Sequence, residues 1–135
     1  MITVVIDTNV IVRYLTQTPP EQYERARELM EKVSAGGARL SLSAAVVGEV
    51  AAILHHVYGK PRSEVAGTLL AFATARGVEV DEEAIVVGAL ERSRDLKDID
   101  FIDAYIAAKA ADAGRPVASF DKELHKRLGT TVFGL

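Results

Sequence analysis

Short runs of β-branched residues alternate along the chain with longer stretches in which apolar residues recur every three or four positions. The first pattern is typical of buried strands, and the second is typical of helices that bury one face. We therefore predict strands over residues 1–6, 39–42, 78–80, 116–119 and 130–133, and helices over residues 21–34, 43–58, 61–76, 82–94, 101–113 and 121–128.

Proline and glycine residues mark the ends of these segments. Pro20 suits the first turn of a helix, and Gly59, Gly77 and Gly114 each follow the last residue of a predicted helix. The alternation of strands with helices predicts an α/β fold with one domain over residues 1–135 and a central, mostly parallel sheet of four to five short strands flanked by helices. Ligands of such open sheets bind at the carboxyl ends of the strands.

Composition narrows the classes of protein that fit this pattern. The chain has 135 residues, 49% hydrophobic and 26% charged, with a net charge of −3, which excludes a disordered chain. Because there is no cysteine, disulfide scaffolds and cysteine nucleophiles are excluded. Neither a signal-like N-terminus nor an apolar run of about 18 residues is visible, so we expect a cytoplasmic protein with no membrane association. Since the chain is weakly acidic, any nucleic-acid site must be local or assembled between subunits.

Glu49 is the only charged residue from position 40 to position 59, if histidine is counted as neutral. A carboxylate on an apolar helix face is paired, protonated, bound to a cation or open to a cleft. The alternative is a glutamate that turns to solvent or pairs with an arginine. Its neighbours on the same helix face are all apolar: Ala45, Val46, Ala52 and Ile53.

Asp103 repeats this anomaly in the predicted helix over residues 101–113. It lies opposite Asp112 on the helix and beside Ile106 and Ala107. The alternative is a capping role, in which Asp100 is the N-cap residue and Asp103 is an acid of the first turn that favours the helix dipole.

Two further acidic residues, Asp7 and Asp121, each follow a predicted strand. Each has a structural alternative, because Asp7-Thr8-Asn9 suits a turn and Asp121 suits a helix N-cap. Carboxylates that gather at one site repel each other unless a positive charge neutralises them. The usual solution is a hard divalent cation, and Mg²⁺ or Mn²⁺ takes oxygen ligands.

Other chemistries are not indicated by the sequence. Residues 95–106 resemble a calcium loop in their acidic spacing, but they have no glycine at the sixth position and no glutamate at the twelfth. No phosphate-binding glycine loop or serine–histidine–aspartate signature is present. We expect no ligand or catalytic role for the three histidines, His55, His56 and His125.

Four segments resemble, in order, the motifs of the PIN-domain nucleases. They are VIDTNV at residues 5–10, SAAVVGEV at 43–50, DAYIAA at 103–108 and VASFDKEL at 117–124. The resemblance covers essentially the whole chain. Its length and short N-terminus resemble most the VapC-type toxins of type II toxin–antitoxin pairs.

This resemblance implies a set of site residues. The acidic residues that would bind Mg²⁺ or Mn²⁺ and carry catalysis are Asp7, Glu49, Asp103 and Asp121. Three polar residues would lie beside them: Asn9, Ser119 and Glu123. Ser119 stands where threonine is commoner, and Glu123 replaces the usual aspartate, which changes its reach toward a metal.

The resemblance also implies a metal-dependent endoribonuclease with an RNA substrate, a cognate antitoxin and a homodimeric state. Hydrolysis of a phosphodiester bond needs an activated water and neutralisation of phosphoryl charge, and Mg²⁺ held by carboxylates supplies both. Four cations near the fourth motif could contact RNA phosphates, or could belong to a solvated helix face: Arg115, Lys122, Lys126 and Arg127.

Three alternatives stay open at this point. An aspartyl-phosphate phosphatase would need an aspartate two residues after the nucleophile, where Asn9 stands, and it leaves Glu49 unexplained. A non-catalytic protein-binding module could keep the fold without the activity. A housekeeping RNA-processing nuclease would share the chemistry and lack the antitoxin.

Overall fold

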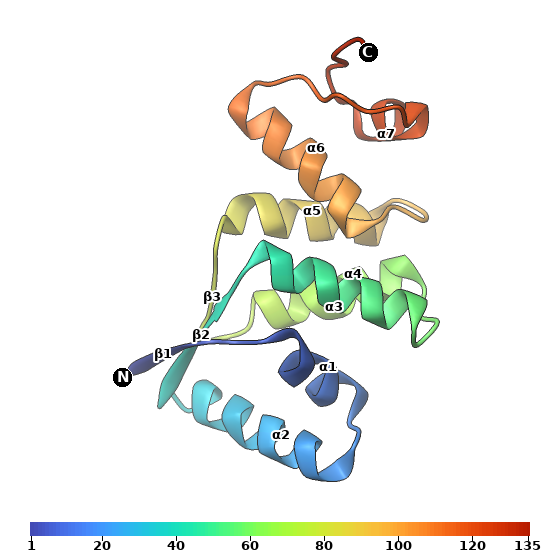
Figure 1. The fold of residues 1–135 in the computed structure, drawn as a ribbon. Helices are drawn as coiled ribbons and strands as arrows, with labels where there is room; N and C mark the ends of the chain where they lie inside the picture. Colours follow the sequence, from blue (N-terminus) through green and yellow to red (C-terminus); the bar gives the residue numbers. More distant parts are fainter.

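The computed structural model describes residues 1–135 and contains a three-stranded parallel sheet (Figure 1). Strand β1 (Ile2–Val5) pairs with β2 (Ala38–Leu42), and β2 pairs with β3 (Val78–Val80). The strand order follows the chain order, and each connection between strands contains helices. This topology confirms the predicted α/β class, because parallel strands require crossover connections.

Seven helices accompany the sheet, and none is long and apolar enough to cross a membrane. Six of them match predicted helices to within a few residues. Figure 1 shows them stacked roughly in chain order, with α2 near one end and α7 at the other. Their bounds are α1 Thr8–Thr16, α2 Pro20–Ser34, α3 Ala44–His56, α4 Arg62–Ala73, α5 Glu83–Asp95, α6 Phe101–Ala113 and α7 Lys122–Leu128.

Helix α1 is the element that sequence reasoning missed. No helix was predicted between residues 7 and 20, and a turn was the structural alternative for Asp7-Thr8-Asn9, but a helix begins at Thr8 immediately after Asp7. Thr8, Ile11 and Val12 are buried, and they follow the three-and-four spacing of a helix face. Burial of this face outweighs the low helix propensity of β-branched residues.

The sheet is shorter than the predicted four to five strands. The segments over residues 116–119 and 130–133 pair with each other through one isolated parallel bridge, Val117 with Val132. The Val117 N–H donates to the Thr131 carbonyl at 2.7 Å, and the Phe133 N–H donates to the Val117 carbonyl at 2.9 Å. Pro116 has no N–H with which to extend the ladder. Strand β1 is therefore an edge of the sheet, with Val5 79% exposed.

The core lies where the central strand β2 meets the surrounding helices. Leu40 and Leu42 of β2 are essentially inaccessible, as are Ile11 of α1 and Leu69 of α4. Full burial of such a side chain stabilises the fold by about 1.5–3 kcal/mol each. Helix α5 packs against both α4 and α6 and contributes Leu90 to the same core. The core thus fixes α3 and α6, which carry Glu49 and Asp103, and it also fixes α1, which begins directly after Asp7.

Candidate active site

An acidic cavity of about 170 Å³ lies where the beginning of α6 meets the beginning of α7. It brings together three of the predicted site residues, Asp103, Asp121 and Glu123. The remaining residues that line it are Arg62, Asp98, Ile99, Asp100, Leu124, Arg127 and Leu128. The two arginines are outnumbered by five carboxylates, so the cavity has a net negative lining.

Asp121 is held in place by the helix that it begins. Its Oδ1 accepts hydrogen bonds from the backbone N–H groups of Glu123 at 3.0 Å and Leu124 at 3.2 Å. The Asp121 N–H in turn donates to the Ser119 hydroxyl at 3.0 Å. The expected N-cap is therefore present. It occupies only one carboxylate oxygen, because Oδ2 makes no hydrogen bond within the chain.

The alternative arrangement for the start of α6 is present, with Asp100 as the N-cap and Asp103 as an acid of the first turn. The N-cap of α6 is Asp100, whose Oδ1 accepts from the Ile102 N–H at 3.3 Å. Asp103 lies half-buried in the first turn and makes no hydrogen bond within the chain. Its pKa is raised above the ordinary value of 3.8 by burial first, and then by the charges of Asp100 and Asp121, against a smaller opposing effect of Arg62.

Asp7 stands at the carboxyl end of β1 and immediately before α1. Its backbone is extended, its side chain is exposed, and it makes no cap hydrogen bond. The turn that is the structural alternative for Asp7 is therefore absent, and the carboxylate does not cap the helix that stands in its place. Asn9, two residues further on, opens into a different cavity between α1 and α2.

Glu49 is an exposed residue of α3 and forms no ion pair. The residue before it, Gly48, lies under α6, because a Cβ built at Gly48 would come within 2.5 Å of the Ile102 Cδ1 atom. Gly48 of α3 thus lies against Ile102 of α6, and Glu49 and Asp103 are the residues that directly follow these two. Since α1 also packs against α3, the elements that carry Asp7, Glu49 and Asp103 form a continuous packed series.

The four acidic residues do not form one compact cluster in the structure. No group of three or more acidic or histidine side chains is arranged to hold a metal ion. Asp103, Asp121 and Glu123 share the acidic cavity, whereas Asp7 and Glu49 do not line it. The carboxylate oxygens that line the cavity nevertheless suit a hard cation, because the two arginines neutralise their mutual repulsion only in part.

The predicted basic residues are dispersed. Arg127 lines the acidic cavity and donates to the Lys97 carbonyl. Arg115 lines a separate cavity of about 470 Å³ between α5, α6 and residues 128–131. Lys122 and Lys126 are exposed on α7 and form no ion pair.

Sequence reasoning missed the contribution of Arg62 to the acidic cavity. The Arg62 Nη1 atom lies 2.7 Å from the Asp98 Oδ1 atom and lowers the pKa of that carboxyl group, through their hydrogen bond first and their charge attraction second. These residues come from α4 and from the loop before α6, 36 positions apart. No local pattern could have predicted the pair, since tertiary packing alone brings the two segments together.

The fold and this cavity define a single-domain α/β protein with a carboxylate-lined candidate metal site. The family model described as PIN domain matches residues 4–129, so the chain belongs to the PIN-domain family. PIN domains are generally metal-dependent nucleases. A search of the curated proteins found no match.

Proposed function

We propose that this PIN domain is a Mg²⁺-dependent endoribonuclease that hydrolyses RNA phosphodiester bonds. The observation that carries the proposal is the acidic cavity, in which the Asp103 carboxylate makes no hydrogen bond and its pKa is raised by burial first and then by the charges of Asp100 and Asp121. Repulsion of this kind is typical of functional sites, where the missing positive charge comes from a ligand.

By the resemblance of the four motifs, Asp7, Glu49, Asp103 and Asp121 are the residues that would hold Mg²⁺ or Mn²⁺, and of these Asp103 and Asp121 line the acidic cavity. When bound, such an ion would lower the pKa of a coordinated water and neutralise charge on the phosphoryl group. The N-cap hydrogen bonds fix Asp121 with one oxygen free, and Ser119 fixes the backbone that leads into it. Arg62 and Arg127 border the same cavity, where a guanidinium can hold a phosphate oxygen.

The first test is RNA cleavage by Asp103→Asn and Asp121→Asn variants. Each variant should lose on the order of 100-fold or more of the Mg²⁺-dependent cleavage of a labelled single-stranded RNA, because each removes a proposed metal ligand. Asp112→Asn is the matched control, since it changes the same charge on the exposed side of α6 and should leave cleavage unchanged.

A second readout of the same variants does not depend on activity. Mg²⁺ should raise the Tm of the wild-type protein and of Asp112→Asn, and should raise it less in Asp103→Asn, because a ligand that binds only the folded state stabilises it. If the wild type binds Mg²⁺ but cleaves no RNA, the non-catalytic binding module becomes the better interpretation. Equal cleavage by all the variants would overturn the site assignment.

We further propose that the nuclease is a cytoplasmic VapC-type toxin that acts as a homodimer with a cognate antitoxin. This finer assignment is supported by the resemblance of the four motifs, in their order, described above. The second candidate is a housekeeping RNA-processing nuclease, which would use the same cavity and the same metal. The two candidates differ in whether the nuclease has an inhibitory protein partner. Co-expression with the adjacent reading frame distinguishes them.

A further inference from the structure

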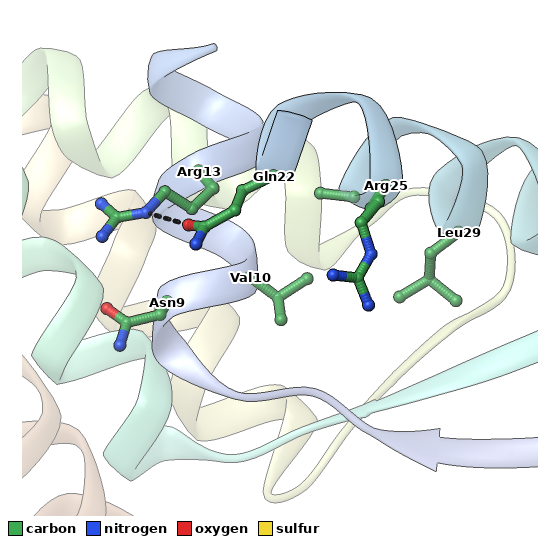
Figure 2. A pocket seen from close by; sticks show the side chains of 7 residues that line it. Asn9, Val10, Arg13, Gln22, Arg25 and Leu29 are labelled. Carbon is green, nitrogen blue, oxygen red and sulfur yellow. Dashed lines mark hydrogen bonds between the residues drawn. The ribbon is translucent and has the colours of Figure 1, made fainter. Parts of the chain in front are cut away.

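A second cavity, of about 380 Å³, lies between α1 and α2, toward the opposite end of the helix stack from α7 (Figures 1 and 2). Its volume falls within the range of sites that hold small ligands. The only charged residues in its lining are Arg13 and Arg25, and no carboxylate lines it. The other lining residues are Asn9, Val10, Gln22, Ala26 and Leu29.

Arg13 is oriented by a side-chain hydrogen bond and not by an ion pair. Its Nε donates to the Gln22 Oε1 atom at 2.8 Å, as Figure 2 shows. This bond fixes the plane of the guanidinium and leaves its two terminal nitrogens without a partner in the chain. Asn9 lies one helical turn before Arg13, so its amide is presented from the same face of α1.

Arg25 is also unpaired, although α2 is rich in glutamate. Arg27, which does not line the cavity, forms ion pairs with both Glu24 and Glu31. Glu21 and Glu28 are one turn away from Arg25 on α2, yet neither pairs with it or lines the cavity. Figure 2 shows the Arg25 side chain extending from α2 between Val10 and Leu29.

The lining therefore combines two unpaired guanidinium groups and two amides with an apolar floor of Val10, Ala26 and Leu29. Guanidinium groups bind phosphate, like carboxylate, through paired N–H donors. The apolar floor can accept the sugar or base that accompanies a phosphate in a nucleic acid. An isolated inorganic anion would leave this apolar surface uncovered.

The charge of the rest of the molecule favours such an anchor. The net charge is −3 and the acidic cavity has a negative lining, so the proposed catalytic region repels an RNA backbone. Arg13 stands six residues after Asp7, a rise of about 9 Å along an α-helix. Helices α1, α3 and α6 pack in series from one cavity to the other, with Asp7 directly before α1, Glu49 on α3 and Asp103 on α6.

We propose that the α1–α2 cavity is a phosphate-binding subsite for the RNA substrate, in which Arg13 and Arg25 hold a backbone phosphate away from the bond that is cleaved. This inference rests on the proposed ribonuclease function and adds a residue-level account of substrate binding. An acidic peptide is the other class of ligand that two arginines could bind. The apolar floor beside both guanidinium groups and the proximity of α1 to Asp7 favour RNA.

The test is the affinity of Arg25→Gln for a labelled single-stranded RNA, measured by fluorescence anisotropy in EDTA over a series of salt concentrations. We expect binding to weaken about tenfold and the salt slope of log K to fall by about 1, because one phosphate contact is lost. Arg27→Gln is the matched control, since it removes the same charge from the same helix outside the cavity. The double variant Arg13→Gln/Arg25→Gln should bind RNA more weakly than Arg25→Gln alone.

In Mg²⁺, Arg25→Gln should raise KM much more than it lowers kcat, because the contact is equal in the ground state and the transition state. Both single variants should unfold within about 0.5 kcal/mol of the wild type. If Arg25→Gln and Arg27→Gln bind RNA alike while the wild type cleaves it, the subsite is overturned and the proposed function stands. If the wild type neither binds nor cleaves RNA, both are overturned. If Arg25→Gln loses an acidic protein partner but keeps its RNA affinity, the cavity is a protein-binding site and the inference is wrong.

Discussion

Asp103 occupies the place that its structural alternative gives it, in the first turn of α6 after the N-cap residue Asp100, but its carboxylate makes no hydrogen bond there. Asp100 already supplies the cap of α6, so Asp103 has no capping bond to make, and it is half-buried beside two other carboxylates. The sequence predicted this residue from its position on an apolar helix face. For Asp121, the helix cap and the site position were treated as alternatives. The structure has both, because Asp121 caps α7 and also lines the acidic cavity.

The raised pKa of Asp103 has a defined consequence for stability. A carboxyl group with a raised pKa binds its proton more tightly in the folded state than in the unfolded state. The stability that the protonated form contributes is therefore fully present below the ordinary pKa of 3.8 and is lost as the pH rises through the raised value. In metal-free buffer, Asp103→Asn should accordingly be more stable than the wild type at neutral pH, and the difference should vanish below the ordinary pKa.

Chemical denaturation over a pH series in EDTA measures this difference directly. Asp112→Asn should show no comparable pH dependence, because Asp112 is exposed on the other side of the helix. A less stable Asp103→Asn at neutral pH would mean that the ionised carboxylate is a structural group, which contradicts its proposed role as a metal ligand.

At the scale of elements, the contact between α3 and α6 decides how closely Glu49 and Asp103 can approach. It depends on Gly48, where any side chain larger than hydrogen meets Ile102. Gly48→Leu should destabilise the protein by about 1–3 kcal/mol through overpacking. It should also reduce Mg²⁺-dependent cleavage under conditions in which the variant remains folded.

Gly88 provides the comparison for this prediction. It lies within α5, and a Cβ built there meets no atom within 4 Å. Gly88→Ala should therefore stabilise the protein by up to about 1 kcal/mol, the difference in helix propensity between the two residues, and leave cleavage unchanged. Thermal melts and cleavage rates of both variants are the measurement. Equal activity of folded Gly48→Leu and Gly88→Ala would show that the α3–α6 contact does not position the site.

At the scale of the whole molecule, the proposed toxin and the housekeeping nuclease differ in whether an inhibitory partner exists. A ribonuclease toxin must be inhibited in the cell that makes it, and a cation from a partner can pair with carboxylates that would otherwise bind metal. We predict that a small antitoxin encoded next to this chain co-purifies with it and lowers its nuclease activity, with a basic residue in the acidic cavity. Co-expression with the adjacent reading frame, followed by a cleavage assay, is the test. A neighbour that fails to bind, or that binds without inhibiting, would favour the housekeeping nuclease.

The sequence by itself determined the α/β class, six of the seven helices and the acidic residues worth testing, because these depend on local periodicity and on charges at apolar positions. It did not predict α1, whose β-branched residues are helical only through burial of Ile11 and Val12 against the core. It also predicted too many strands in the sheet. Residues 116–119 and 130–133 pair with each other through one bridge and do not join the sheet, so β1 is an edge strand.

Only the tertiary structure decided which charges meet. It placed Arg62 beside Asp98, gathered Asp103, Asp121 and Glu123 at one cavity, and left Arg13 and Arg25 unpaired between α1 and α2. These relations join segments that are distant in sequence, and they follow from how the apolar faces of the helices pack. A periodic pattern specifies which face of a helix is buried, but it does not specify which other helix covers that face.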